Sequence, residues 1–243
     1  MNCIYAFAED QTLTNQELGG KGANLAEMTR LGLPVPAGFT ITTAACRQYL
    51  ASAKQEAGFL EDELMKAIHI LEEKTQRQLG NAEQPLLVSV RSGAPISMPG
   101  MMDTILNLGL NDQTVIGLAE MTNDPWFAYD CYRRLIQMFG DVVYGIDKPI
   151  FEAALTALKN KRQVQKDTDL TLVDLKQLIE TYKGLYVAAG QYQFPQSVDQ
   201  QLRLAIEAVF KSWQNPRAQT YRRLNQIDGA MGTAVNVQQM VFG

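Results

Sequence analysis

The sequence has few of the residues that build covalent or metal frameworks. Its three cysteines, Cys3, Cys46 and Cys131, are widely spaced and odd in number, so they suggest neither a disulfide framework nor a cysteine-rich metal site. This usage fits a reducing compartment, and we expect a cytoplasmic protein. The one histidine, His69, stands between two isoleucines without a nucleophile or ligand motif around it. We therefore interpret it as a structural residue.

Long hydrophobic runs and an excess of positive charge are also absent. No apolar stretch approaches the length that spans a membrane, and the first residues lack the basic start and apolar core of a signal peptide. With 22 Lys and Arg against 26 Asp and Glu, the formal charge is −4. This balance gives no support for a nucleic-acid or acidic-membrane partner, and we expect neither.

The chain has the composition of a globular protein. Its 243 residues, 46% apolar and 20% charged, allow one large domain or two small ones. Helix and strand signals alternate in the first part, whereas hardly any strand signal follows residue 110 until the C-terminal segment. Asp112 and Asp124 are expected to cap helices, the second followed by Pro125. The hydrophobic periodicity predicts helices over 21–31, 43–53, 61–79, 112–120, 125–143, 151–159, 172–189, 198–213 and 216–226, and strands within 3–7, 33–42, 86–90, 103–108 and 235–241.

Residues 86–110 combine a buried strand with a loop rich in glycine and proline. The apolar run ends in Arg91, and Gly93 and Gly100 lie in the loop that follows. Glycines let backbone N–H groups approach phosphate oxygens, and an arginine supplies a rigid fork of donors that fits them. An anion site and a hairpin with a surface arginine explain this pattern about equally well.

A second candidate for anion binding is the segment Gly19-Gly20-Lys21-Gly22. It places an ammonium at the expected start of a helix, where free N–H groups and the helix dipole favour a phosphate. The segment is not a Walker A loop, because the glycine spacing differs and neither Ser nor Thr follows the lysine. A glycine-rich turn with an exposed lysine is the alternative.

Several segments together resemble one family. They are GGKGANLAEM at 19–28, LPVPAGFTITT at 33–43, VSVRSG at 88–93, SMPGMMDTILNLGL at 97–110, FAYD at 127–130, YRR at 132–134, NPRA at 215–218 and GTAVNVQ at 232–238. They resemble the N-terminal, nucleotide-binding part of the pyruvate, phosphate dikinases, and the resemblance covers essentially the whole chain. The loop 97–104 favours these enzymes over the related phosphoenolpyruvate synthases.

The resemblance implies an α+β, ATP-grasp-like nucleotide-binding fold, incomplete at its C-terminus and with a large helical segment. Residues 1–110 would form the subdomain with the phosphate-binding residues, 111–230 the helical segment, and 231–243 the start of the second subdomain. By the same resemblance, Lys21 and Arg91 hold the ATP triphosphate and serve catalysis. Gly100, Asp103 and Thr104 belong to the loop over the phosphates.

The resemblance also assigns the far end of the chain to the adenine. Gln238, Gln239 and Val241 match the strand that receives the base, although Gln239 is neutral where relatives can carry an acid. Magnesium is an implied cofactor, and its protein ligands are expected outside this chain.

In the family, the β-phosphoryl group of ATP passes to a histidine on a separate domain and then to pyruvate. The products are phosphoenolpyruvate, AMP and diphosphate. We expect the phosphohistidine and pyruvate-binding domains to lie outside this chain, which would be an N-terminal fragment of a phosphotransferase, inactive alone. ATP and those domains are the expected partners, with a homodimer as a further expectation. The alternative is a folded, non-catalytic fragment or interaction module that has lost ATP binding.

Overall fold

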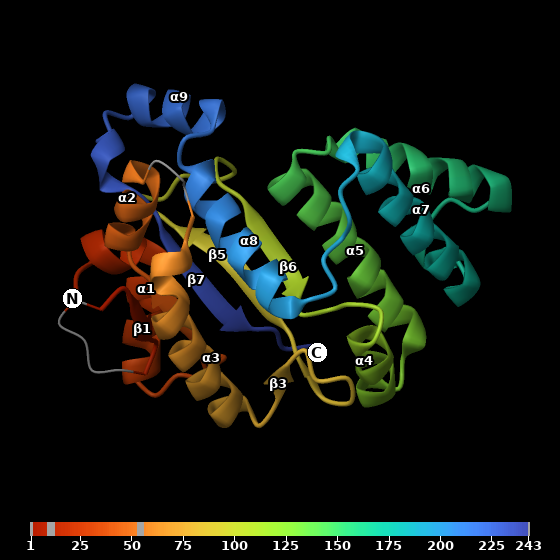
Figure 1. Ribbon diagram of the computed structural model, residues 1–243, viewed down its shortest axis with the longest axis horizontal. Coiled ribbons are helices and arrows are strands. Elements are labelled where there is room, and N and C mark those ends of the chain that lie inside the picture. The colour runs from red at the N-terminus through yellow and green to blue at the C-terminus, as the bar shows by residue number, and fades with distance from the viewer. Residues whose placement is uncertain (1, 9–12, 53–55, 243) are drawn as a thin grey trace. The chain divides into compact units, whose positions relative to one another are not determined.

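A computed structural model describes residues 2–8, 13–52 and 56–242 of the chain (Figure 1). Its contacts divide the chain into two compact units. Unit 1 comprises Met1–Arg77, Val88–Thr104 and Leu202–Gly243, and unit 2 comprises Gln78–Leu87 and Ile105–Gln201. Helices and an antiparallel sheet occur together, which confirms the α+β class. The expected division at residues 110 and 230 stays a prediction.

Unit 1 is built on antiparallel strands. These are β1 (Ile4–Ala6), β2 (Gly38–Ile41), β5 (Val88–Gly93) and β7 (Ala234–Gln239), and they follow one another across the sheet in the order β1-β2-β7-β5. Thr40 of β2 is the register partner of Asn236 in β7, and Arg91 of β5 is the register partner of the same asparagine. The strand latest in the sequence therefore lies between two strands from the first hundred residues.

Helix α1 (Asn15–Arg30) packs against β5 and β7 and carries the glycine-rich segment. A capping box begins the helix, because the Thr14 backbone N–H donates to Glu17 Oε2 over 2.9 Å. The helix is broken at Gly19, whose φ of 69° and ψ of 160° lie outside the helical region. The second part of α1 thus starts next to Lys21, close to the helix start that the sequence predicts.

The other helices of unit 1 surround these strands. They are α2 (Thr43–Ala51), η1 (Gly58–Leu60), α3 (Glu61–Thr75), α9 (Pro216–Leu224), η3 (Gly229–Met231) and, from Leu202 onward, α8 (Val198–Ser212). Thr42 caps α2 by accepting from the N–H of Ala45. Ala53, where this helix was expected to end, lies outside the described residues.

Unit 2 is mainly helical. It contains β3 (Gln78–Leu79), β4 (Pro85–Leu86), most of β6 (Thr104–Leu108), α4 (Thr114–Thr122), α5 (Pro125–Tyr144), α6 (Lys148–Arg162), η2 (Asp167–Asp169) and α7 (Leu172–Gly190). Helix α5 packs against α4, α6 and α7. Asp124 caps α5 as predicted, since its Oδ1 accepts from the Phe127 N–H over 2.9 Å. None of the described helices is long and apolar enough to cross a membrane.

Two boundary predictions are wrong for local reasons. Asp112 does not cap α4, because the Asn111 side chain accepts from the N–H groups of Gln113 and Thr114 instead. Asp112 is engaged by the Tyr132 hydroxyl and the Lys183 ammonium. Helix α3 was expected to reach residue 79 but ends at Thr75, where Gln76 takes a left-handed conformation with a φ of 53°.

Candidate anion-binding site

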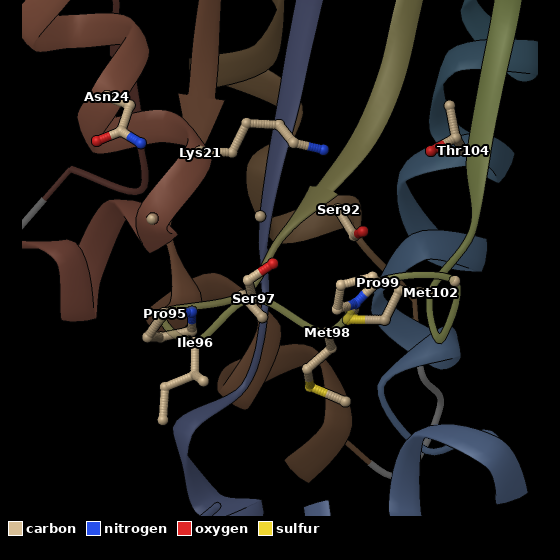
Figure 2. A pocket seen from close by; sticks show the side chains of 14 residues that line it. Lys21, Asn24, Ser92, Pro95, Ile96, Ser97, Met98, Pro99, Met102 and Thr104 are labelled. Atoms are coloured by element: carbon tan, nitrogen blue, oxygen red, sulfur yellow. The ribbon is translucent and has the colours of Figure 1, made fainter. Parts of the chain in front are cut away.

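A cavity of about 580 Å³ opens in unit 1 between the glycine-rich part of α1 and the loop after β5 (Figure 2). Its volume is typical of small-molecule sites. None of its lining residues carries a carboxylate, whereas an ammonium, two serine hydroxyls and several backbone segments contribute. The lining residues are Gly20, Lys21, Asn24, Ser92, Gly93, Ala94, Pro95, Ile96, Ser97, Met98, Pro99, Gly100, Met102 and Thr104.

Lys21 brings a destabilised positive charge to this cavity. In Figure 2 its side chain extends from α1 toward the strands. The side chain is exposed overall, but partial burial still lowers the pKa of its ammonium below the ordinary value, and the charge of Arg91 lowers it further. The structure therefore brings Lys21 and Arg91, 70 positions apart in the chain, within electrostatic reach of each other.

Arg91, the second predicted phosphate-binding cation, lies one residue before Ser92 and is not itself among the residues that line the cavity. Its Nε is buried and lacks a hydrogen-bond partner among the described residues. Within the part of the chain that the structure describes, no carboxylate forms an ion pair with Lys21 or Arg91. Two neighbouring cations without a counter-charge repel each other, so an anion between them would be stabilised by both.

The loop after β5 is anchored from the side of α9. Met98 is buried against Trp213, and Met101 and Met102 pack on the same cluster. Trp213 is itself fully buried, and its Nε1 donates to the Gly229 carbonyl over 2.9 Å. This apolar anchor holds the loop that carries Gly100, whose φ of 70° suits glycine.

The predicted phosphate residues divide into two groups. Lys21, Gly100 and Thr104 line the cavity. Arg91 and Asp103 lie outside the lining. The Asp103 carboxylate accepts from Arg217 Nη2 over 2.5 Å and from Asn215 Nδ2 over 3.3 Å. The ion pair with Arg217 fixes the end of the loop to the start of α9.

The predicted adenine residues lie toward the other end of β7 from the cavity. Gly93 of the cavity is opposite Ala234, whereas Gln239 is opposite Val88. The Gln238 side chain donates to the Pro36 carbonyl over 3.1 Å, and Val241 is exposed. None of Gln238, Gln239 and Val241 is among the residues that line the cavity.

The structure adds polar residues that motif reasoning did not select. Asn24, Ser92 and Ser97 line the cavity, and Asn236 lies beside Arg91 in the sheet. The sequence contained one signal for Asn236, namely a polar residue within the alternating valines of the C-terminal strand. His69, by contrast, is exposed on α3, where its Nε2 is 3.2 Å from Glu73.

The described residues contain no group of three or more His, Cys, Asp or Glu side chains that could hold a metal ion. Because the cavity lining also lacks these side chains, its donor set suits an anion and not a magnesium ion. We therefore assign no chemical step of this chain to magnesium.

Fold and cavity together define an α+β domain with a cationic, glycine-lined site. The family model described as "Pyruvate phosphate dikinase, AMP/ATP-binding domain" matches residues 15–61 and 56–243. The chain belongs to this family, which confirms the resemblance seen in its motifs.

Among curated relatives, the chain is similar to three pyruvate, phosphate dikinases over 99% of its length. It is 55% identical to that of Clostridium symbiosum, 53% identical to that of Giardia intestinalis, and 54% identical to "Pyruvate, phosphate dikinase 1, chloroplastic" of Arabidopsis thaliana. The match covers 28%, 28% and 25% of these relatives, respectively. The chain thus spans about a quarter of their length.

Proposed function

We propose that this chain binds ATP, with Lys21 and Arg91 holding the phosphates. The observation that carries the proposal is the pair of neighbouring cations without a carboxylate partner among the described residues. A polyphosphate supplies the missing negative charge and also accepts from the buried Arg91 Nε. Each charge-assisted contact of this kind contributes about 1.5–3 kcal/mol.

The cavity lining supports a role in orienting the bound phosphates. Ser92, Ser97 and Thr104 offer hydroxyl groups, and Gly100 offers backbone without a side chain. When bound, ATP supplies the phosphoryl group; this chain's residues neutralise its charge and fix its position. Asp103 would act through the loop that it ties to Arg217.

The finer assignments rest on the family alone. We propose an ATP-grasp-like arrangement in which Gln238, Gln239 and Val241 receive the adenine, with magnesium held by residues outside this chain. The whole protein would transfer the β-phosphoryl group of ATP to a histidine and then to pyruvate, on domains absent here. A homodimer and a cytoplasmic location also stay proposals, the latter because some relatives are described as chloroplastic.

Calorimetric titration with ATP tests the proposed site. The parent chain is expected to show saturable binding, and Lys21→Ala and Arg91→Ala are each expected to weaken it by about 10- to 100-fold through loss of one cation. Lys66→Ala, which removes an exposed lysine of α3, is the control and should leave affinity unchanged. Absence of binding by a folded parent would favour the alternative, a non-catalytic fragment.

The pH dependence of affinity should report the lowered pKa of Lys21. Bound phosphate favours the charged ammonium of Lys21. The affinity for ATP is therefore highest below the pKa that Lys21 has in the ligand-free protein, and it falls as pH rises through that pKa. The decrease in ATP affinity should begin at a lower pH than it would if Lys21 had the ordinary pKa of a lysine. In Lys21→Arg the guanidinium stays charged, and the fall should disappear. An unchanged profile in Lys21→Arg would show that another group titrates.

A further inference from the structure

A row of three polar side chains crosses the sheet on the face packed by α1. Thr40, Asn236 and Arg91 are successive register partners on β2, β7 and β5, and such partners point to the same face of a sheet. Thr40 and Asn236 are almost fully buried, at 2% and 1% exposure. A Cβ on Gly22 would lie 2.8 Å from Thr40 Oγ1 and 2.9 Å from Asn236 Oδ1. The backbone of α1 at Gly22 therefore packs closely against this row.

Only the oxygen of the Asn236 side-chain amide has a hydrogen-bond partner among the described residues. Its Oδ1 accepts from the Thr40 hydroxyl over 2.8 Å, whereas its Nδ2 is buried without a hydrogen-bond partner among the described residues. Arg91 Nε, on the neighbouring strand, is in the same state. A buried donor group without a partner is destabilising, so two such groups on adjacent strands point to a function.

The unpaired amide nitrogen of Asn236, a residue outside the cavity lining, lies close to Gly93. A Cβ on Gly93 would meet Asn236 Nδ2 at 2.4 Å, and the same point lies 3.7 Å from Lys21 Cβ. Gly93 also lines the cavity. Asn236 thus approaches the place where Lys21, Gly93 and the strand of Arg91 converge.

At this position an uncharged side chain such as Asn236 leaves the two cations without an internal counter-charge. An aspartate has the same shape, but its carboxylate would stand beside Arg91 and near Lys21, and it would pair with them in a poorly solvated setting. The cations would then carry an internal counter-charge that competes with any anionic ligand. An amide fills the position and orients donors without this competition.

We propose that Asn236, oriented by Thr40, is a positioning residue that keeps Lys21 and Arg91 available for the phosphates of a nucleotide. This inference rests on the proposed function of the same site. It assigns a role to a residue of the C-terminal strand that lies away from the adenine positions 238–241.

Substitution of the amide by a carboxylate tests the proposal directly. Asn236→Asp is expected to weaken binding of ATP and of inorganic triphosphate by about 10- to 100-fold, because one cation contact is lost to the new carboxylate. Asn160→Asp makes the same chemical change at an exposed position of α6, and its affinities should stay within about twofold of the parent. Equal affinity in folded Asn236→Asp and parent would overturn the proposal.

A second readout separates charge competition from a merely structural role. The pKa of Lys21 can be followed by NMR after ¹³C-methylation of the lysines, with Lys21→Arg to assign the signal. Asn236→Asp should raise this pKa, whereas Asn236→Ala should not, because only the first adds a negative charge. A Lys21 pKa that is the same in Asn236→Asp and the parent would mean that Asn236 only packs the sheet.

Thr40→Val covers the case in which Asn236→Asp does not fold. It preserves a β-branched side chain and removes the hydroxyl that orients the amide, so affinity for triphosphate should fall several-fold without a change in charge; parental affinity would overturn the proposal. If the parent binds neither ATP nor triphosphate, the proposed function fails, and the Lys21 pKa in Asn236→Asp still decides whether Asn236 controls the cations.

Discussion

Gly19→Ala is expected to prevent stable folding of unit 1. A Cβ at this position would lie 1.5 Å from the Gly93 carbonyl oxygen, and the φ of 69° with a ψ of 160° is accessible almost only to glycine. Strain and overlap together should cost more than about 3 kcal/mol. Loss of the cooperative transition in urea, followed by circular dichroism, would be the observed result.

Gly32→Ala is the matched control for this experiment. Gly32 also has a positive φ, of 74°, but a Cβ there would meet nothing within 4 Å. Its replacement should therefore cost only the strain, about 1–2 kcal/mol. Equal stability of Gly19→Ala and Gly32→Ala would contradict the close approach of α1 to β5. It would also contradict the position assigned to Lys21, because the neighbouring Gly20 N–H donates to the Ala94 carbonyl after β5 over 3.0 Å.

Trp213→Ala is expected to have the second large effect, on stability and on binding together. The indole is fully buried, Arg222 stacks over it at 4.1 Å from the ring centroid, and Met98 of the cavity loop packs against it. Removing so large a core side chain typically costs about 3–5 kcal/mol. The loop would also lose its anchor, so ATP affinity should fall even in molecules that remain folded.

Two variants separate these contributions. Trp213→Phe keeps most of the apolar contact and should retain ATP binding with a smaller loss of stability. Trp126→Ala removes the other tryptophan, a partly buried residue of α5 whose Nε1 donates to the Leu170 carbonyl over 2.6 Å. Its ATP affinity should match the parent when both are folded. Denaturant unfolding gives the stability and calorimetry the ATP affinity of the same samples. If folded Trp213→Ala bound ATP as tightly as the parent, Trp213 would not be needed to hold the cavity loop for binding.

The elements that local chemistry determines were predictable from sequence. The cap at Asp124 forms as expected, because a side-chain oxygen next to a free N–H is a short-range arrangement. The cap at Asp112 failed for one local and one tertiary reason: a competing asparagine stands one residue earlier, and Asp112 has distant partners on α5 and α7. Such tertiary competition leaves no mark in a local window of sequence.

From sequence, Lys21, Gly100 and Thr104 of the cavity lining could be selected as candidates, but neither the remaining lining residues nor the assembly of the cavity could be predicted. Lys21 and Arg91 each had an alternative explanation as a surface cation, which was the more frequent one for Lys21 and about equally good for Arg91. Their mutual repulsion appears only once α1 packs on β5. The ion pair of Asp103 with Arg217 is likewise invisible in sequence, since the two residues belong to distant segments.

The position of β7 has a consequence for the synthesis of the protein. On the ribosome, β2 and β5 emerge long before residues 234–239, and the edge that each presents to β7 stays unpaired until that strand arrives. At translation rates of about 5–20 residues per second, the wait after β5 is on the order of ten seconds. During it, two strand edges stay open to other nascent chains. Molecular chaperones that shield such edges would therefore be needed most before the last residues of β7 leave the exit tunnel.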